Sequence, residues 1–196
     1  MEKSGESVKV LLVKNEFEDP EILLEMFRSL FKNMKHIEKD DYIAIYFSYD
    51  NDSDIIHILN ALETELVGSI HAYISSDMSE DRLEKEVSIA ISLMNVLPVG
   101  VYNFKEALLK VKNIDNKKEI LNYILAGSGI NEMFISEFAE NDLNVSRASK
   151  AMFIHRNTMI YKLNKLKTNA SFDLTNFKDA YILFSLLENK WKKLWK

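Results

Sequence analysis

Residues 144–167 read NVSRASKAMFIHRNTMIYKLNKLK, and their pattern predicts the architecture of the C-terminal part of the chain. Its first residues predict a short helix that begins at Asn144 or Ser146, because both side chains are good N-caps. A break follows at residues 153–155, and residues 156–167 predict a second, amphipathic helix. Its apolar stripe consists of Met159, Leu163 and Leu166. The stretch therefore predicts two helices joined by a tight turn.

The polar face of the second predicted helix suits DNA. A helix fits the major groove of B-DNA, and side chains near its N-terminus reach base edges there. Arg156 can pair bidentately with guanine and Asn157 with adenine, so we expect these two residues to read bases. Lysines further along, up to Lys167, would neutralise phosphates without selecting sequence. The predicted DNA-binding residues are Asn144, Ser146, His155, Arg156, Asn157, Thr158, Tyr161, Lys162 and Lys165.

Two aromatic members of this set have alternative roles. We expect His155, together with Thr158, to contact backbone phosphates, and the alternative for His155 is a helix cap. Tyr161 either packs under the helix or reaches the sugar-phosphate edge.

The charge of the chain is divided along its length. The formal net charge is -5, but residues 1–140 hold 14 Lys and Arg against 26 Asp and Glu, whereas residues 141–196 hold 11 against 4. A basic segment beside an acidic one is typical of a protein in which one part meets a polyanion. Solvated charges on an ordinary helix bundle are the alternative explanation.

The motif HRNTM at residues 155–159, with Tyr161 and Leu163, resembles the C-terminal helix-turn-helix of the purine-catabolism (PucR) and carbohydrate-diacid (CdaR) regulator family, whose signature is His-Arg-Asn-Thr-Leu. The resemblance covers about residues 118–190, including a preceding helix and a long terminal helix. It implies a bacterial-type transcriptional regulator that binds double-stranded DNA as a homodimer and controls metabolic genes. Two recognition helices related by a twofold axis would bind half-sites roughly 34 Å apart.

The chain departs from the family pattern at three positions. Ile160 and Asn164 stand where the family usually has Arg, which removes two phosphate contacts. Phe153 occupies a turn position that is often Gly in other helix-turn-helix proteins. Ile160 and Asn164 are the basis of the alternative function, a protein-protein interaction module with a drifted helix-turn-helix.

Upstream, the pattern alternates between strands and helices. The predicted order is β-α-β-β-α-β-α-β-α, which indicates an α+β sandwich whose sheet has four or five strands. The predicted strands are residues 8–13, 34–38, 42–47, 69–74 and 101–102. The predicted helices begin at Pro20, after Asp52 or Ser53, at Ser79 and after Tyr102.

Residues 69–95 and 101–102 resemble the middle domain of the same family, a degenerate relative of the diguanylate-cyclase (GGDEF) fold, which implies a ferredoxin-like sandwich. A working cyclase needs a Gly-Gly-Asp/Glu-Glu-Phe turn for nucleotide and metal. The corresponding hairpin turn here is KDDY at residues 39–42, so cyclase chemistry is not expected.

The predicted domains are a tail at residues 1–7, the sandwich at residues 8–115, a linker helix with a flexible Gly-Ser-Gly break at residues 116–130, and an all-α DNA-binding domain at residues 131–196. An effector, either a small molecule or a protein, would act at the N-terminal domain. The aromatic residues of the terminal helix predict core and interface positions.

Several function classes lack the residues that they need. The chain has no cysteine, which excludes disulfides, thiolate zinc sites and cysteine nucleophiles. His36, His57 and His71 are scattered over different elements, and no glycine pattern forms a phosphate-binding loop. We therefore expect no catalysis, metal or cofactor. The absence of a long apolar run or signal segment predicts a cytoplasmic protein without a membrane span.

Overall fold

The computed structural model describes residues 8–16, 19–48, 55, 57–59, 70–76 and 78–187. The chain divides into two compact units, Met1–Lys112 and Asn113–Lys196. Within the described ranges, no helix combines the length and the apolar character that crossing a membrane requires.

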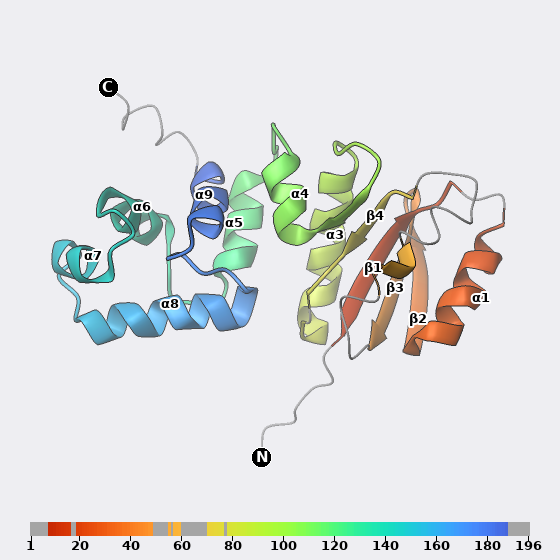
Figure 1. The fold of residues 1–196 in the computed structure, drawn as a ribbon, viewed down its shortest axis with the longest axis horizontal. Coiled ribbons are helices and arrows are strands. Elements are labelled where there is room, and N and C mark those ends of the chain that lie inside the picture. Colours follow the sequence, from red (N-terminus) through yellow and green to blue (C-terminus); the bar gives the residue numbers. More distant parts are fainter. Residues whose placement is uncertain are drawn as a thin grey trace, which may run out of the picture. The chain divides into compact units, whose positions relative to one another are not determined.

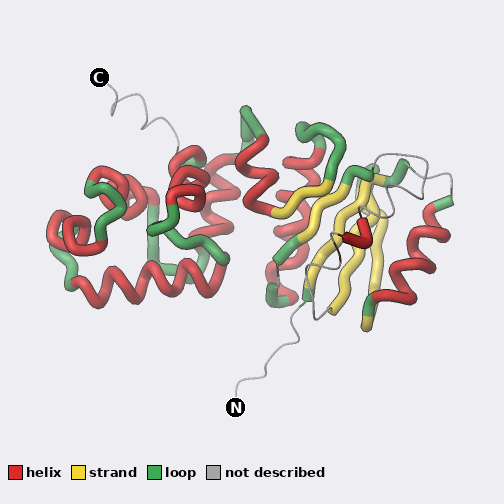
Figure 2. Tube along the Cα trace, in the orientation of Figure 1, coloured by secondary structure: helices red, strands yellow, loops and turns green. Residues whose placement is uncertain are grey.

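The first unit is built on a five-stranded sheet with the order β2-β3-β1-β4-β5. Figure 2 draws the strands of this sheet in yellow. Its strands are β1 (Lys9–Lys14), β2 (Lys32–Lys39), β3 (Tyr42–Ser48), β4 (Ala72–Ile74) and β5 (Val101–Asn103). The central strand β1 pairs antiparallel with β3 and β4, and β4 pairs parallel with β5. The apolar runs of β1 and β3 are buried because both strands lie inside the sheet.

Helices cover both faces of this sheet (Figure 1). They are α1 (Pro20–Leu30), α3 (Leu83–Met94), which follows a 3-10 turn at Glu80–Arg82, and α4 (Phe104–Lys110). Leu11 of β1 belongs to the same buried cluster as Phe27 of α1. On the other face, the hydroxyl of Tyr73 in β4 donates a hydrogen bond to Glu86 of α3. The sheet is therefore enclosed between two helical layers.

Local signals predicted most of these elements. Asp19 accepts a hydrogen bond from the Glu21 N–H at 3.1 Å, and Pro20 occupies the first position of α1. The predicted hairpin is present as β2 and β3, with Asp40 at φ +53° in its turn. Of the helix predicted after residue 52, only Ile55 and residues 57–59 are described, and these are helical.

Strand β4 is shorter than predicted. It begins at Ala72 rather than at residue 69, which lies outside the described residues. Its ladder with β1 spans Leu11 to Val13, and Ile70 and His71 precede the strand, although the His71 carbonyl accepts a hydrogen bond from the Lys14 N–H of β1 at 2.9 Å. The His71 side chain is buried, with Nε2 2.9 Å from the Met94 carbonyl oxygen of α3.

The second unit is all-helical. Its helices are α5 (Lys117–Leu125), α6 (Glu132–Glu140), α7 (Val145–Ala151), α8 (Arg156–Ala170) and α9 (Phe177–Ser185). The buried side chains of this unit include Ile120, Phe138, Leu166 and Leu183 of the helices, and Phe172 between α8 and α9. An α+β unit followed by a helix-turn-helix unit confirms the predicted fold class. The ferredoxin-like and cyclase-like relationship of the first unit stays a prediction.

The segment predicted as a linker contains ordered structure of the second unit. Helix α5 buries Ile120 and Ile124 and contacts α8. In the Gly-Ser-Gly segment, Ser128 is buried; its hydroxyl donates to the Leu125 carbonyl at 2.7 Å and accepts from the Ile130 N–H at 3.1 Å. Both glycines have positive φ, which a residue with a Cβ rarely adopts. The Gly-Ser-Gly segment is therefore a hydrogen-bonded turn, and its flexibility stays a prediction.

Candidate nucleic-acid interface

Helix α7 starts at an Asn cap. The Asn144 side-chain oxygen accepts hydrogen bonds from the backbone N–H groups of Ser146 and Arg147, at 3.0 and 3.1 Å. Asn144 is therefore the cap, while Ser146 lies exposed in the first turn. The Arg147 guanidinium pairs with Asp142 in the preceding turn. The two predicted site residues thus lie together at the beginning of α7.

A tight turn joins α7 to α8. The Phe153 N–H donates to the Lys150 carbonyl at 3.2 Å, and the Ile154 N–H donates to the Ser149 carbonyl at 3.0 Å. These two bonds form the pattern that ends a helix when the next residue is left-handed. Phe153 is that residue, with φ +53°.

Helix α8 begins with His155 as its cap. Nδ1 of His155 accepts a hydrogen bond from the Asn157 N–H at 3.2 Å. Because Nδ1 accepts, the neutral ring carries its proton on Nε2, which can donate to another group. Arg156, Asn157 and Thr158 follow in the first turn, and all of them are exposed. The first turn of an α-helix leaves backbone N–H groups without intrahelical acceptors, so the N-terminal end of α8 can donate hydrogen bonds to a bound group.

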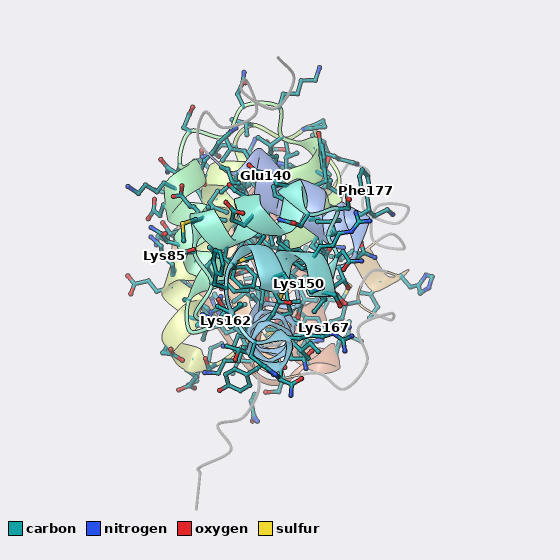
Figure 3. The ribbon with its side chains drawn as sticks, turned by 90° about the vertical axis from the view of Figure 1, so that its left-hand side faces the viewer. Lys85, Glu140, Lys150, Lys162, Lys167 and Phe177 are labelled. Atoms are coloured by element: carbon teal, nitrogen blue, oxygen red, sulfur yellow. The ribbon has the colours of Figure 1, made fainter. Side chains whose placement is uncertain are left out.

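One face of α8 is packed and the opposite face is open. Figures 1 and 3 show the other helices of the unit on one side of α8. Met159, Leu163 and Leu166 are buried on that side. Exposed side chains recur on the opposite side at helical spacing, and we call them the outward face: Asn157, Tyr161, Asn164 and Thr168.

The lysines of α8 differ in what they contact. Lys162 is half-buried; its Nζ donates to the Gly129 carbonyl and lies 6.0 Å from the centroid of the Phe134 ring. Nζ of Lys165 lies over the ring of Tyr161, 5.3 Å from its centroid. Figure 3, which views α8 nearly end-on, shows Lys162 and Lys167 on opposite sides of this helix. Among the predicted site residues, Lys162 therefore points back to its own unit.

The C-terminal end of α8 is tied to the next segment by an ion pair. Nζ of Lys167 lies 2.9 Å from Oδ2 of Asp173, whose Oδ1 accepts from the Thr175 N–H and hydroxyl at 3.0 and 2.5 Å. The Thr175 hydroxyl and then Lys167 hold the pKa of Asp173 below its ordinary value. Bonding to Asp173 in turn raises the pKa of Lys167. Lys167 thus has an internal partner.

Sequence reasoning missed Asn164 as a candidate for base reading. It lies on the outward face, seven residues after Asn157 and three after Tyr161. Residues seven apart share a helix face, so the spacing between Asn157 and Asn164 could have predicted that both lie on the outward face. Lys150, exposed in the last turn of α7, was also outside the predicted set (Figure 3).

The two helices, their turn and the exposed face of the second helix define a helix-turn-helix domain. Residues 134–188 match the model of the PucR C-terminal helix-turn-helix domain. This match confirms the resemblance seen at residues 155–159 and places this segment with the DNA-binding domains of transcription regulators.

Individual similar proteins agree with this assignment. Over 81 residues, 41% of this chain, the sequence is 30% identical to the carbohydrate diacid regulator of Escherichia coli strain K12. The match spans 18% of that regulator's length. These similarities relate the helix-turn-helix segment of this chain to transcription regulators.

A solved structure was also found, the regulator of polyketide synthase expression from Bifidobacterium adolescentis. It aligns with 92% of this chain and 78% of its own, with a TM-score of 0.46 and 14% identity.

Proposed function

We propose that this protein is a sequence-specific DNA-binding regulator, and that α8 is its recognition helix. The single observation that carries the proposal is the open side of α8, where the outward face lies opposite the buried Met159, Leu163 and Leu166. No helix of the same unit covers this face among the described residues (Figure 1). An uncovered polar helix face next to a capped N-terminus can enter the major groove.

The contacts divide into base reading and phosphate binding. Arg156, Asn157 and Asn164 are proposed to read base edges, since Arg pairs bidentately with guanine and Asn with adenine. Lys165 and the Nε2–H of His155 would bind phosphates. The other proposed backbone contacts are Asn144, Ser146, Thr158 and Tyr161. Lys162 is proposed to contribute indirectly, because its hydrogen bond to the Gly129 carbonyl holds α8 against its own unit.

The active form is proposed to be a homodimer that acts in the cytoplasm on metabolic genes. One recognition helix discriminates few base pairs, whereas two related by a twofold axis double the site. The first unit would carry the dimer contacts or an effector, because its excess of acidic residues disfavours DNA. The name of the carbohydrate diacid regulator supports metabolic control.

The test is a selection of DNA by the full-length protein. A random-sequence duplex pool is titrated at low and at high salt, and the retained fraction is sequenced. We expect an enriched inverted repeat whose half-sites lie one helical turn apart, with binding that weakens steeply as salt rises. No retention at low salt would contradict the proposal and favour the protein-protein interaction module.

Two variants separate the proposed roles. Arg156→Ala should lose about 1 to 3 kcal/mol of binding free energy chiefly at its own base pair, and Lys165→Ala should weaken every sequence similarly. Equal losses on all sequences for both variants would contradict the assignment of base reading to Arg156.

A further inference from the structure

The backbone of Phe153 is in a conformation that its side chain disfavours. Its φ of +53° is left-handed, a region that glycine enters freely and that a residue with a Cβ enters at a cost. The turn needs this conformation, because the bonds from Phe153 to Lys150 and from Ile154 to Ser149 close the end of α7. Glycine would therefore serve this turn better than phenylalanine does.

The ring of Phe153 contributes little to the fold. It is 96% exposed, and no ring stacks on it in the part of the chain that the structure describes. Phe177 offers a comparison within the same unit. It is 77% exposed in regular helix α9, and its ring stacks on Tyr181 with centroids 6.4 Å apart. Phe153 thus combines an unfavourable backbone with an aromatic ring that stabilises nothing inside the unit.

The surroundings of Phe153 favour DNA over protein as its partner. Among its neighbours in the chain, Lys150, Ala151, His155 and Arg156 are exposed, whereas the larger apolar residues Met152 and Ile154 are half-buried. Large contiguous apolar patches mark surfaces that dock proteins, and a single exposed ring among mostly basic exposed side chains is not such a patch. DNA offers apolar groups among its phosphates, including the thymine methyl group and the carbons of deoxyribose.

We propose that the Phe153 ring packs against deoxyribose carbons or a thymine methyl group when α8 enters the major groove. This inference rests on the proposed function, since it assumes that the turn before α8 reaches the DNA. The ring would then increase the affinity for DNA, while the left-handed backbone at Phe153 lowers the stability of the free protein. Such a trade-off is common at binding sites.

The substitution Phe153→Gly tests this in the full-length protein, using the duplex recovered from the selection. We expect the melting temperature to rise by about 4 °C, because the turn loses its strain. Affinity for the duplex should fall roughly tenfold, within the range for loss of a specific contact. The two changes have opposite signs, so unfolding cannot account for the loss of binding.

Two further variants serve as controls. Phe153→Ala keeps the unfavourable backbone and removes the ring, so affinity should fall without the rise in melting temperature. Phe177→Ala removes an exposed ring on α9, and its affinity should equal that of the original protein. A duplex with deoxyuridine in place of thymidine identifies the group contacted: weaker binding of the original protein indicates the methyl group, and unchanged binding indicates the sugar.

Each contrary result has one meaning. If Phe153→Gly binds the duplex as tightly as the original protein, the Phe153 contact is wrong and the proposed function stands. If the original protein binds no duplex at low salt, both the proposed function and the Phe153 contact are wrong.

Discussion

The ammonium group of Lys162 in α8 donates a hydrogen bond to the backbone carbonyl of Gly129, 33 residues earlier in the chain. Gly129 lies in the turn that precedes α6, and a Cβ at this position would lie 3.3 Å from that ammonium nitrogen. The bond therefore joins the proposed recognition helix to the turn after α5. The lysine that makes it was predicted from the sequence to bind DNA.

Lys162→Met should lower the free energy of unfolding by about 1 kcal/mol, because it removes this hydrogen bond and keeps the alkyl stem. The salt dependence of DNA binding should stay the same. Lys165→Met is the matched control, and it should reduce the slope of log K against log salt by about 1. It removes a contact with the exposed Tyr161 ring, so it should lower stability less than Lys162→Met does. Urea denaturation and salt titration measure both effects. A similar loss of slope in the two variants would mean that Lys162 also binds phosphate.

His155 has two roles that substitutions can separate. His155→Ala removes the cap of α8 and should cost about 1 kcal/mol of stability, whereas His155→Asn keeps a capping oxygen and should cost much less. Both variants lose the Nε2–H, so both should bind DNA several-fold more weakly. Thermal melting and a binding titration measure the two effects. If His155→Asn binds DNA as tightly as the original protein, His155 only caps α8 and makes no phosphate contact.

Asn164 should determine one base pair of the operator. Seven residues separate it from Asn157, which corresponds to roughly 10 Å along the helix, or about three base pairs. We expect Asn164→Ala to lose about 1 to 3 kcal/mol at one A·T pair, and Asn157→Ala to lose as much at another about three base pairs away.

Sequencing of the DNA selected by each variant locates these pairs. Asn122→Ala, which changes an exposed Asn on α5, is the control and should keep the original sequence preference. An unchanged preference in Asn164→Ala would remove this residue from the reading face.

Stability should depend on pH through Asp173. The lowered pKa of its carboxyl means that the folded protein favours the charged form, so this stabilisation is present above the ordinary carboxyl pKa. It is lost as the pH falls through the lowered value. Asp173→Ala should therefore be less stable by about 1 kcal/mol at pH 7, and the difference should shrink below about pH 4. Urea denaturation from neutral to acidic pH measures it, and a constant difference would contradict the role of the charge.

Elements with strong local signals were predicted well. Asp19 before Pro20 marks the start of α1, and Asn144 marks the start of α7, because a cap bonds to N–H groups only two or three residues away. The motif at residues 155–159 identified the helix-turn-helix, which the family match confirms. Strand β4 was predicted less well, since its length depends on pairing with β1, about 60 residues earlier.

The helix-turn-helix, the buried stripe of α8 and the residues at its N-terminus follow from the sequence alone, because periodicity and capping act over a few residues. Which polar side chains of α8 remain available depends instead on how the helices of the second unit pack. Lys162 and Lys167 have the same chemistry as Lys165, but their partners, Gly129 and Asp173, come from other segments of the unit. Those partners come within reach only when the helices pack, so no pattern within α8 could distinguish a lysine that holds the fold from one that can bind DNA.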